Sequence, residues 1–79
     1  MKRKFVRNLI KGYVKYSDWE IVDNAVVIIY IRYQNEYNKW IKEEIGYTLT
    51  NEFGEFCFAL NQYNYKNLEY IIEVFEPLN

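Results

Sequence analysis

The chain of 79 residues contains no histidine, and it has only one cysteine, one proline and three glycines. Without histidine it lacks the commonest general base and metal ligand, which excludes Ser-His-Asp catalysis, Cys-His catalysis and zinc sites that use histidine. The three glycines are separated from one another, so there is no glycine-rich loop for a phosphate group. We therefore predict neither an enzymatic activity nor a metal or cofactor site.

Cys57 has no second cysteine with which to form an internal disulfide. It lies between Phe56 and Phe58, and these neighbours predict a buried and inert thiol. The basic N-terminus is not followed by an apolar segment, so we expect no signal peptide. The most apolar run, residues 25–31, is too short for a membrane span of about 20 residues. We accordingly expect a cytoplasmic protein without a membrane partner.

Apolar residues are abundant by contrast. They make up 51% of the chain, and aromatic residues alone make up 20%, with nine tyrosines among them. A chain of this size has a small core relative to its surface, and that core cannot enclose every aromatic side chain. Exposed tyrosine and tryptophan are typical of binding surfaces, so we expect part of this surplus to contact a partner.

Residues 19–33 are the stretch around which the fold is expected to form. Between Ala25 and Ile31 both side-chain parities are apolar, which is typical of a central strand covered on two faces. Asp23-Asn24 precedes this run and is suited to a two-residue turn. The pattern therefore predicts a hairpin of strands 19–22 and 25–33.

Two further strands are predicted at 47–50 and 55–60, joined by a turn at 51–54 in which Gly54 supplies a positive φ. Alternation along these strands indicates which side chains form the core. The predicted core residues are Val27, Ile29, Ile31, Phe58 and Leu60, with Leu9, Ile71 and Ile72 docked against them from helices.

Apolar residues recur at helical spacing in residues 3–15 and 65–75, which predicts a basic N-terminal helix and an acidic C-terminal helix. Residues 36–46 fit a short helix and a strand equally well, and both alternatives stay open. The predicted fold class is α+β. A single domain, 1–79, would hold an antiparallel sheet of about four strands, the two terminal helices and a possible short helix at 36–46.

Charge is divided between the two parts of the chain. Residues 1–16 hold six basic residues and no acid, and the remainder holds eleven acids against four basic residues, a net charge of −7. Opposed charged surfaces steer charged partners, so the charges and the aromatic surplus together favour protein binding. The candidate contact residues are Lys4, Arg7, Lys11, Lys15, Trp19, Tyr37, Trp40, Glu69, Glu73 and Glu76.

The expected function is therefore a small, non-enzymatic protein-binding protein, with a homodimer as a further possibility. Asn, Tyr, Ile, Lys and Phe have AT-rich codons and supply 39 of the 79 residues, a bias typical of low-GC bacteria and their phages. This favours an inhibitor of a host or defence protein, encoded by a phage or mobile element, and anti-CRISPR proteins are one such class. The alternative is a small nucleic-acid-binding regulator that uses the basic helix.

Overall fold

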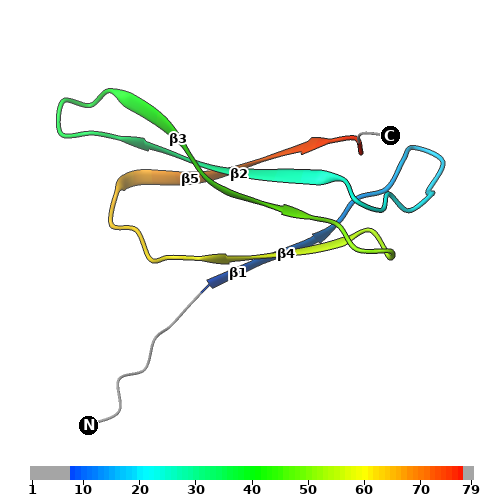
Figure 1. Ribbon diagram of the computed structural model, residues 1–79. Helices are drawn as coiled ribbons and strands as arrows, with labels where there is room; N and C mark the ends of the chain where they lie inside the picture. Colours follow the sequence, from blue (N-terminus) through cyan, green and yellow to red (C-terminus); the bar gives the residue numbers. More distant parts are fainter. Residues whose placement is uncertain (1–7, 78–79) are drawn as a thin grey trace, which may run out of the picture.

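The computed structural model describes residues 8–77, and this part of the chain forms five β-strands and no helix (Figure 1). None of its elements is therefore a helix long and apolar enough to cross a membrane. The strands are β1 (Asn8–Tyr13), β2 (Val26–Gln34), β3 (Trp40–Leu49), β4 (Glu55–Leu60) and β5 (Lys66–Phe75).

The strands make two antiparallel sheets that lie as two layers in Figure 1. The larger sheet has the order β3-β2-β5, and the smaller sheet pairs β1 with β4. The predicted central strand is confirmed, because β2 pairs with β3 on one side and β5 on the other. The predicted α+β class is wrong, because two packed sheets provide the structure that helices were expected to supply.

The core lies between the layers and is built on the inner side of β2. Val27, Ile29 and Ile31 are completely buried there. Leu60 of β4 is also buried, and Phe58 packs against this cluster while remaining partly exposed. These five core predictions follow from strand parity, and the structure bears out their inward orientation.

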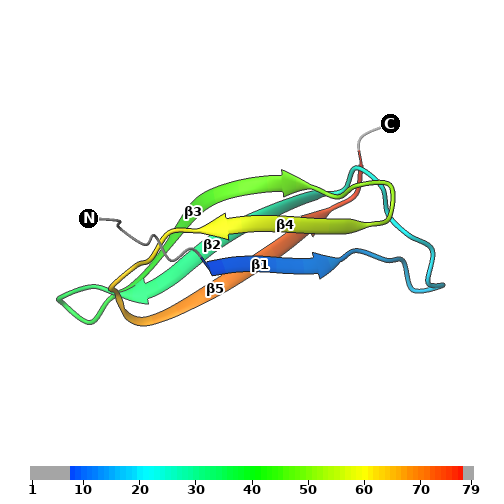
Figure 2. The same ribbon diagram turned by 90° about the horizontal axis from the view of Figure 1, so that it is seen from below.

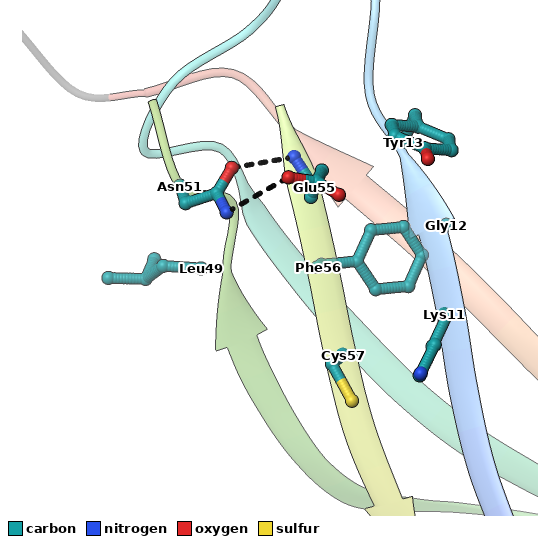
Figure 3. Close-up of a pocket in the computed structure, with 8 residues that line it drawn as sticks. All are labelled: Lys11, Gly12, Tyr13, Leu49, Asn51, Glu55, Phe56 and Cys57. Atoms are coloured by element: carbon teal, nitrogen blue, oxygen red, sulfur yellow. Dashed lines mark hydrogen bonds between the residues drawn. The ribbon is translucent and has the colours of Figure 1, made fainter. Parts of the chain in front are cut away.

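Two glycines let aromatic rings of β4 lie close against a neighbouring backbone, Gly46 between the two layers and Gly12 within the smaller sheet. A Cβ atom built on Gly46 of β3 would lie 2.6 Å from the Phe58 ring, and one built on Gly12 of β1 would lie 2.7 Å from the Phe56 ring. Figure 3 shows the Phe56 ring lying across Gly12. Any larger residue at either position would displace an aromatic side chain of the core.

Both predicted terminal helices are wrong. The part of the 3–15 segment within the described residues forms β1, and the 65–75 segment forms β5; residues 3–7, with Lys4 and Arg7, lie outside the described part. Leu9, Lys11 and Tyr13 alternate with Ile10 and Gly12, so the same residues also fit a strand period. In residues 70–75 β-branched and aromatic residues dominate, a composition that favours a strand.

The predicted hairpin of 19–22 with 25–33 is also wrong. Ile21 makes an isolated bridge with Lys15, and the Val22 N–H donates to the Val14 carbonyl. Ala25 instead extends the β2–β3 pairing, because its N–H donates to the Thr50 hydroxyl, which in turn donates to the Val22 carbonyl. The buried Thr50 side chain thus fixes the backbone just before β2 through these two hydrogen bonds.

The open question at 36–46 is resolved as a strand preceded by a turn. β3 begins at Trp40, and residues 35–39 form the turn that joins it to β2. The predicted strands 47–50 and 55–60 and the turn between them are confirmed, with Gly54 at a φ of 73°. β4 then pairs with β1 in the other layer, so this turn carries the chain from one sheet to the next.

Four residues that were predicted to lie in the core or to be buried are placed elsewhere by strand alternation. Leu9 lies on the outward side of β1, and Ile72 is half-exposed on β5. Ile71 lies on the other face of the larger sheet, opposite Tyr30. Cys57 is exposed, because it shares the outward parity of β4 while its aromatic neighbours point into the core. Helical spacing had placed Leu9, and likewise Ile71 and Ile72, on core-facing stripes of the two predicted helices. The aromatic neighbours of Cys57 had predicted its burial, but on a strand they point to the opposite side.

Candidate interaction surface

Three tight turns share one hydrogen-bond pattern: the first turn (16–20), the second turn (35–39) and the third turn (51–55). In each turn, the N–H of the fourth residue donates to the carbonyl of the first residue. The N–H of the first residue donates to the carbonyl of the fifth residue. In each, the fourth residue has a positive φ, between 61° and 73°. This is the three-residue hairpin that ends in a left-handed residue, a position that glycine and asparagine fill most readily.

The second and third turns use the residues this geometry favours. Their sequences, Asn-Glu-Tyr-Asn-Lys and Asn-Glu-Phe-Gly-Glu, are closely similar, with Asn38 and Gly54 in the left-handed position. The side-chain oxygen of Asn35 accepts from the backbone N–H groups of Tyr37 and Lys39, and Asn51 does the same for Phe53 and Glu55. This repeat of Asn-Glu-aromatic is visible in the sequence, and our sequence analysis missed it.

The first turn departs from this pattern. Trp19 occupies the left-handed position at a φ of 71°, where a bulky residue is disfavoured by about 1–2 kcal/mol. Among residues 8–77, Asp18 alone supports the turn from a side chain, by accepting from the Glu20 N–H. Trp19 is 78% exposed, so no packing in the described part of the chain compensates for this strain. Strain retained at an exposed aromatic residue is typical of a functional position.

Trp19 belongs to a small exposed surface, the hairpin face, made of Tyr13, Lys15, Trp19 and Ile21. The Lys15 ammonium lies 5.8 Å from the Tyr13 ring centre and 5.6 Å from the Trp19 ring centre. Ile21 is paired with Lys15 across the bridge, which places it on the same side. All four side chains are exposed. A cation between two aromatic rings, bordered by an aliphatic residue, therefore faces solvent.

Two hollows adjoin the hairpin face. A recess of about 360 Å³ opens between the layers and is lined by apolar groups that include Val14, Val22 and Val74, with Lys15 and Glu76 at its rim. A shallow groove of about 540 Å³ crosses β1 and β4 (Figure 3). Its lining residues are Lys11, Gly12, Tyr13, Leu49, Asn51, Glu55, Phe56 and Cys57.

The groove is held by structural hydrogen bonds. Asn51 bonds Glu55 twice, once through the Glu55 N–H and once through the carboxylate at 3.5 Å, as the dashed lines in Figure 3 show. These contacts fix the third turn and leave the amine of Lys11 exposed on the outward side of β1. Over residues 8–77 no group of three or more histidines, cysteines or acids is placed to hold a metal ion.

Trp40, Glu69 and Glu73 lie elsewhere, on the outer face of the larger sheet. The Arg32 guanidinium lies 3.9 Å from the Trp40 ring centre and forms a 3.0 Å ion pair with Glu69. Lys42 makes a 3.1 Å ion pair with Glu73 and lies over the Tyr30 ring. The predicted acidic C-terminal helix is therefore replaced by a strand, on which Glu69 and Glu73 form ion pairs with basic residues of the neighbouring strands.

The inner side of the same sheet ends in a stack of tyrosines. The rings of Tyr33 and Tyr65 are parallel at 3.9 Å, and Tyr63 continues the stack at 5.8 Å. The Tyr33 hydroxyl donates to Glu43 at 2.8 Å. This hydrogen bond, followed by burial, raises the pKa of Tyr33 to about 12. The pKa of Tyr30 on the outer face is raised by desolvation and by the nearby Glu73.

The structure thus separates the predicted contact residues. It brings together Lys15 and Trp19 and places Glu76 in the recess that Lys15 also lines, with Lys11 farther along β1 in the groove that reaches Tyr13. It adds Tyr13 and Ile21, which sequence analysis did not identify. Tyr37 lies on the second turn at the other end of the molecule (Figure 1). Comparison with protein-family models, with curated proteins and with solved structures gave no match.

Proposed function

We propose that the chain is a small, non-enzymatic protein-binding domain and that the hairpin face is its contact surface. The observation that carries this proposal is Trp19, an exposed aromatic side chain held in a backbone conformation that the two matching turns give to asparagine and glycine. Replacing Trp19 by asparagine or glycine would relieve the backbone strain at this position. Its presence there is best explained by contact with a partner.

The chemistry of the hairpin face favours a protein partner. Tryptophan and tyrosine contribute the largest share of binding energy at protein interfaces, where they fill pockets of the partner. Asp18 and Glu20 stand in the same turn as Trp19 and would repel a phosphate backbone. The predicted basic helix, on which the nucleic-acid alternative depended, is a strand over the residues described.

The biological role we propose is inhibition of a host or defence protein in the cytoplasm by occupying one of its surfaces. The support for this finer role is the AT-rich codon bias and the single cysteine of the sequence. An inhibitor of this kind requires only a contact surface, which the hairpin face provides.

The test compares Trp19→Asn with Tyr37→Asn. The two side chains have similar exposure, 78% and 74%, and asparagine already fills the left-handed position of the second turn. Tagged wild type and both tagged variants would be incubated with a lysate of a bacterium whose genome is AT-rich. The amount of a partner that wild type captures would then be measured for each variant. We expect Trp19→Asn to lose the partner and Tyr37→Asn to keep it.

Stability distinguishes loss of contact from loss of fold. Because strain is removed, Trp19→Asn should raise the free energy of unfolding by about 1 kcal/mol. A variant that is more stable and yet no longer binds has lost the contact residue alone. Equal capture of the partner by both variants would overturn the hairpin face as the binding surface.

A further inference from the structure

The smaller sheet contains one strand fewer than the larger sheet it covers. β1 pairs with β4, and in residues 8–77 no strand pairs with the other edge of β1. Figure 2 shows β4 between β1 and β3, so the unpaired edge of β1 is the outer edge of this layer. We call it the β1 edge.

With only two strands, the smaller sheet leaves one strand of the larger sheet partly uncovered. Ile10 and Val14 pack with Phe56 and Phe58 onto the cluster built on β2, and β5 contributes no residue to that cluster. The inner side of β5 therefore remains partly open at Tyr70, Ile72 and Val74, which are 39–46% exposed. A third strand added at the β1 edge would lie over these three side chains.

Backbone groups at the β1 edge are available for such pairing. The Val14 N–H donates to the Gly54 carbonyl, toward the β4 side. Because hydrogen-bonding direction alternates along a strand, Ile10 and Gly12 also face β4, and the N–H groups of Leu9, Lys11 and Tyr13 face the open edge. A free row of N–H and carbonyl groups is a template for an incoming strand.

The other strand edges are less suited to pairing. β3 has a register shift opposite Ile29 and Tyr30 and carries Lys42, Glu43 and Glu44 in succession. β5 has a second register shift near Asn67, which has a positive φ. Bulges and charges of this kind protect sheet edges. β4 faces β3, to which the third turn connects it.

Charge indicates what kind of strand would fit. Lys11 and Lys15 lie on the outward parity of β1 and its continuation. A second copy pairing symmetrically about Lys11 would set two lysines opposite each other, which is unfavourable. An incoming strand with acids on its outward side would pair with the charges of the two lysines. Apolar residues on its inward side would cover the exposed apolar side chains of β5.

We propose that the β1 edge binds an extended segment of a partner protein by strand addition, with acidic residues facing Lys11 and Lys15 and apolar residues covering β5. This inference names the partner class of the proposed function and rests on it. Main-chain pairing would supply affinity and the alternating side chains would supply specificity. The bound strand would run alongside the hairpin face and bring its partner to Trp19.

The probes are two capped peptides, one alternating valine with glutamate and its counterpart with lysine in place of glutamate. Amide exchange of the full chain would be followed by NMR with each peptide. We expect the glutamate peptide to bind roughly fivefold tighter at low salt, with the difference shrinking as salt rises. Protection should appear at Leu9, Lys11 and Tyr13, in alternation with Ile10 and Gly12, which are already paired.

Two variants control for side-chain and backbone effects. Lys11→Pro removes one outward N–H without removing a bond to β4, and it should abolish the new protection. Lys11→Gln retains the N–H and should reduce only the preference for glutamate. If Lys11→Pro fails to fold, Ile72→Glu on the half-open side of β5 should also prevent binding, because it places charge beneath the added strand.

Three outcomes would overturn the proposal. The first is that neither peptide binds, and the second is that the new protection appears on β3 or β5. The third is that the β1 edge becomes protected without peptide as the protein concentration rises, which would identify a second copy as the occupant. Failure here combined with Trp19-dependent capture of a partner would leave the proposed function intact, so the two ideas can fail separately.

Discussion

Ile29 and Ile72 are direct neighbours on the same face of the larger sheet, yet their environments differ. They are paired across β2 and β5, and both point toward the smaller sheet. Ile29 is completely buried, whereas Ile72 is 41% exposed. Residue type, secondary structure and orientation are the same, so the difference comes from the position of β5 at the edge of its sheet and from the cover above each residue. β2 has a neighbouring strand on each side and lies behind the smaller sheet, whereas β5 crosses behind β1 at an angle and is covered over only part of its length (Figure 2).

This comparison shows that the molecule has a covered half and an open half. The covered half contains the core cluster and the close contacts of Gly12 and Gly46 with aromatic rings. The open half contains the inner side of β5, the β1 edge and the recess beside the hairpin face. Stability should therefore depend on the first half, and binding on the second.

The largest expected effect tests this division directly. Ile29→Ala should lower the free energy of unfolding by about 2–5 kcal/mol because it leaves a cavity in a core that cannot collapse around it. Ile72→Ala should lower it by about 1 kcal/mol or less, since much of its side chain is already in water. Urea denaturation of both variants provides the comparison. Equal losses would mean that β5 is covered after all.

The contact between Gly46 and Phe58 gives the next largest effect. Gly46→Ala should destabilise the protein by about 1–3 kcal/mol because the new Cβ forces the Phe58 ring out of its place in the core. Cys57→Ala, on the exposed side of β4, is the control and should change stability by about 0.5 kcal/mol at most. A neutral Gly46→Ala would show that the layers can separate without loss.

The sequence predicts the covered half better than the open half. Parity alone identifies Val27, Ile29, Ile31 and Leu60 as inward-facing, because alternation within one strand is a local property. The pairing of β1 with β4 joins segments about 45 residues apart in the chain, and no local pattern specifies such a contact. Without that pairing, neither the extent of the cover nor the exposure of Ile72 can be deduced.

The terminal segments fail for a different reason. Residues 8–15 and 65–75 are compatible with a helical and a strand period, and tertiary context decides between them. Trp19 was named as a contact candidate only because it is aromatic, and that role stays a prediction. Nothing in Ser17-Asp18-Trp19 signals a left-handed backbone, because that position is normally marked by glycine or asparagine.

The titration of Tyr33 follows from its hydrogen bond to Glu43 and from its burial. Its pKa is raised to about 12 from an ordinary value of 10, so the folded state holds this proton more tightly than the unfolded state. The stabilisation is fully present below pH 10 and is lost as the pH rises through about 12. Unfolding measured between these values should show the loss, and Tyr33→Phe should show less of it. An unchanged profile in the variant would assign the loss to other groups.

The smallest effect is expected on the outer face. Glu69→Gln and Glu73→Gln each break a half-exposed ion pair, with Arg32 and Lys42 respectively. Such pairs contribute less than about 1 kcal/mol, because water screens the charges and two long side chains lose freedom. The loss should shrink further as salt is added, and Glu52→Gln in the third turn serves as the control. If these residues belonged to an acidic binding surface, the double variant would slow capture of the partner. We expect capture to be unchanged, since both carboxylates already face basic side chains and lie away from the hairpin face.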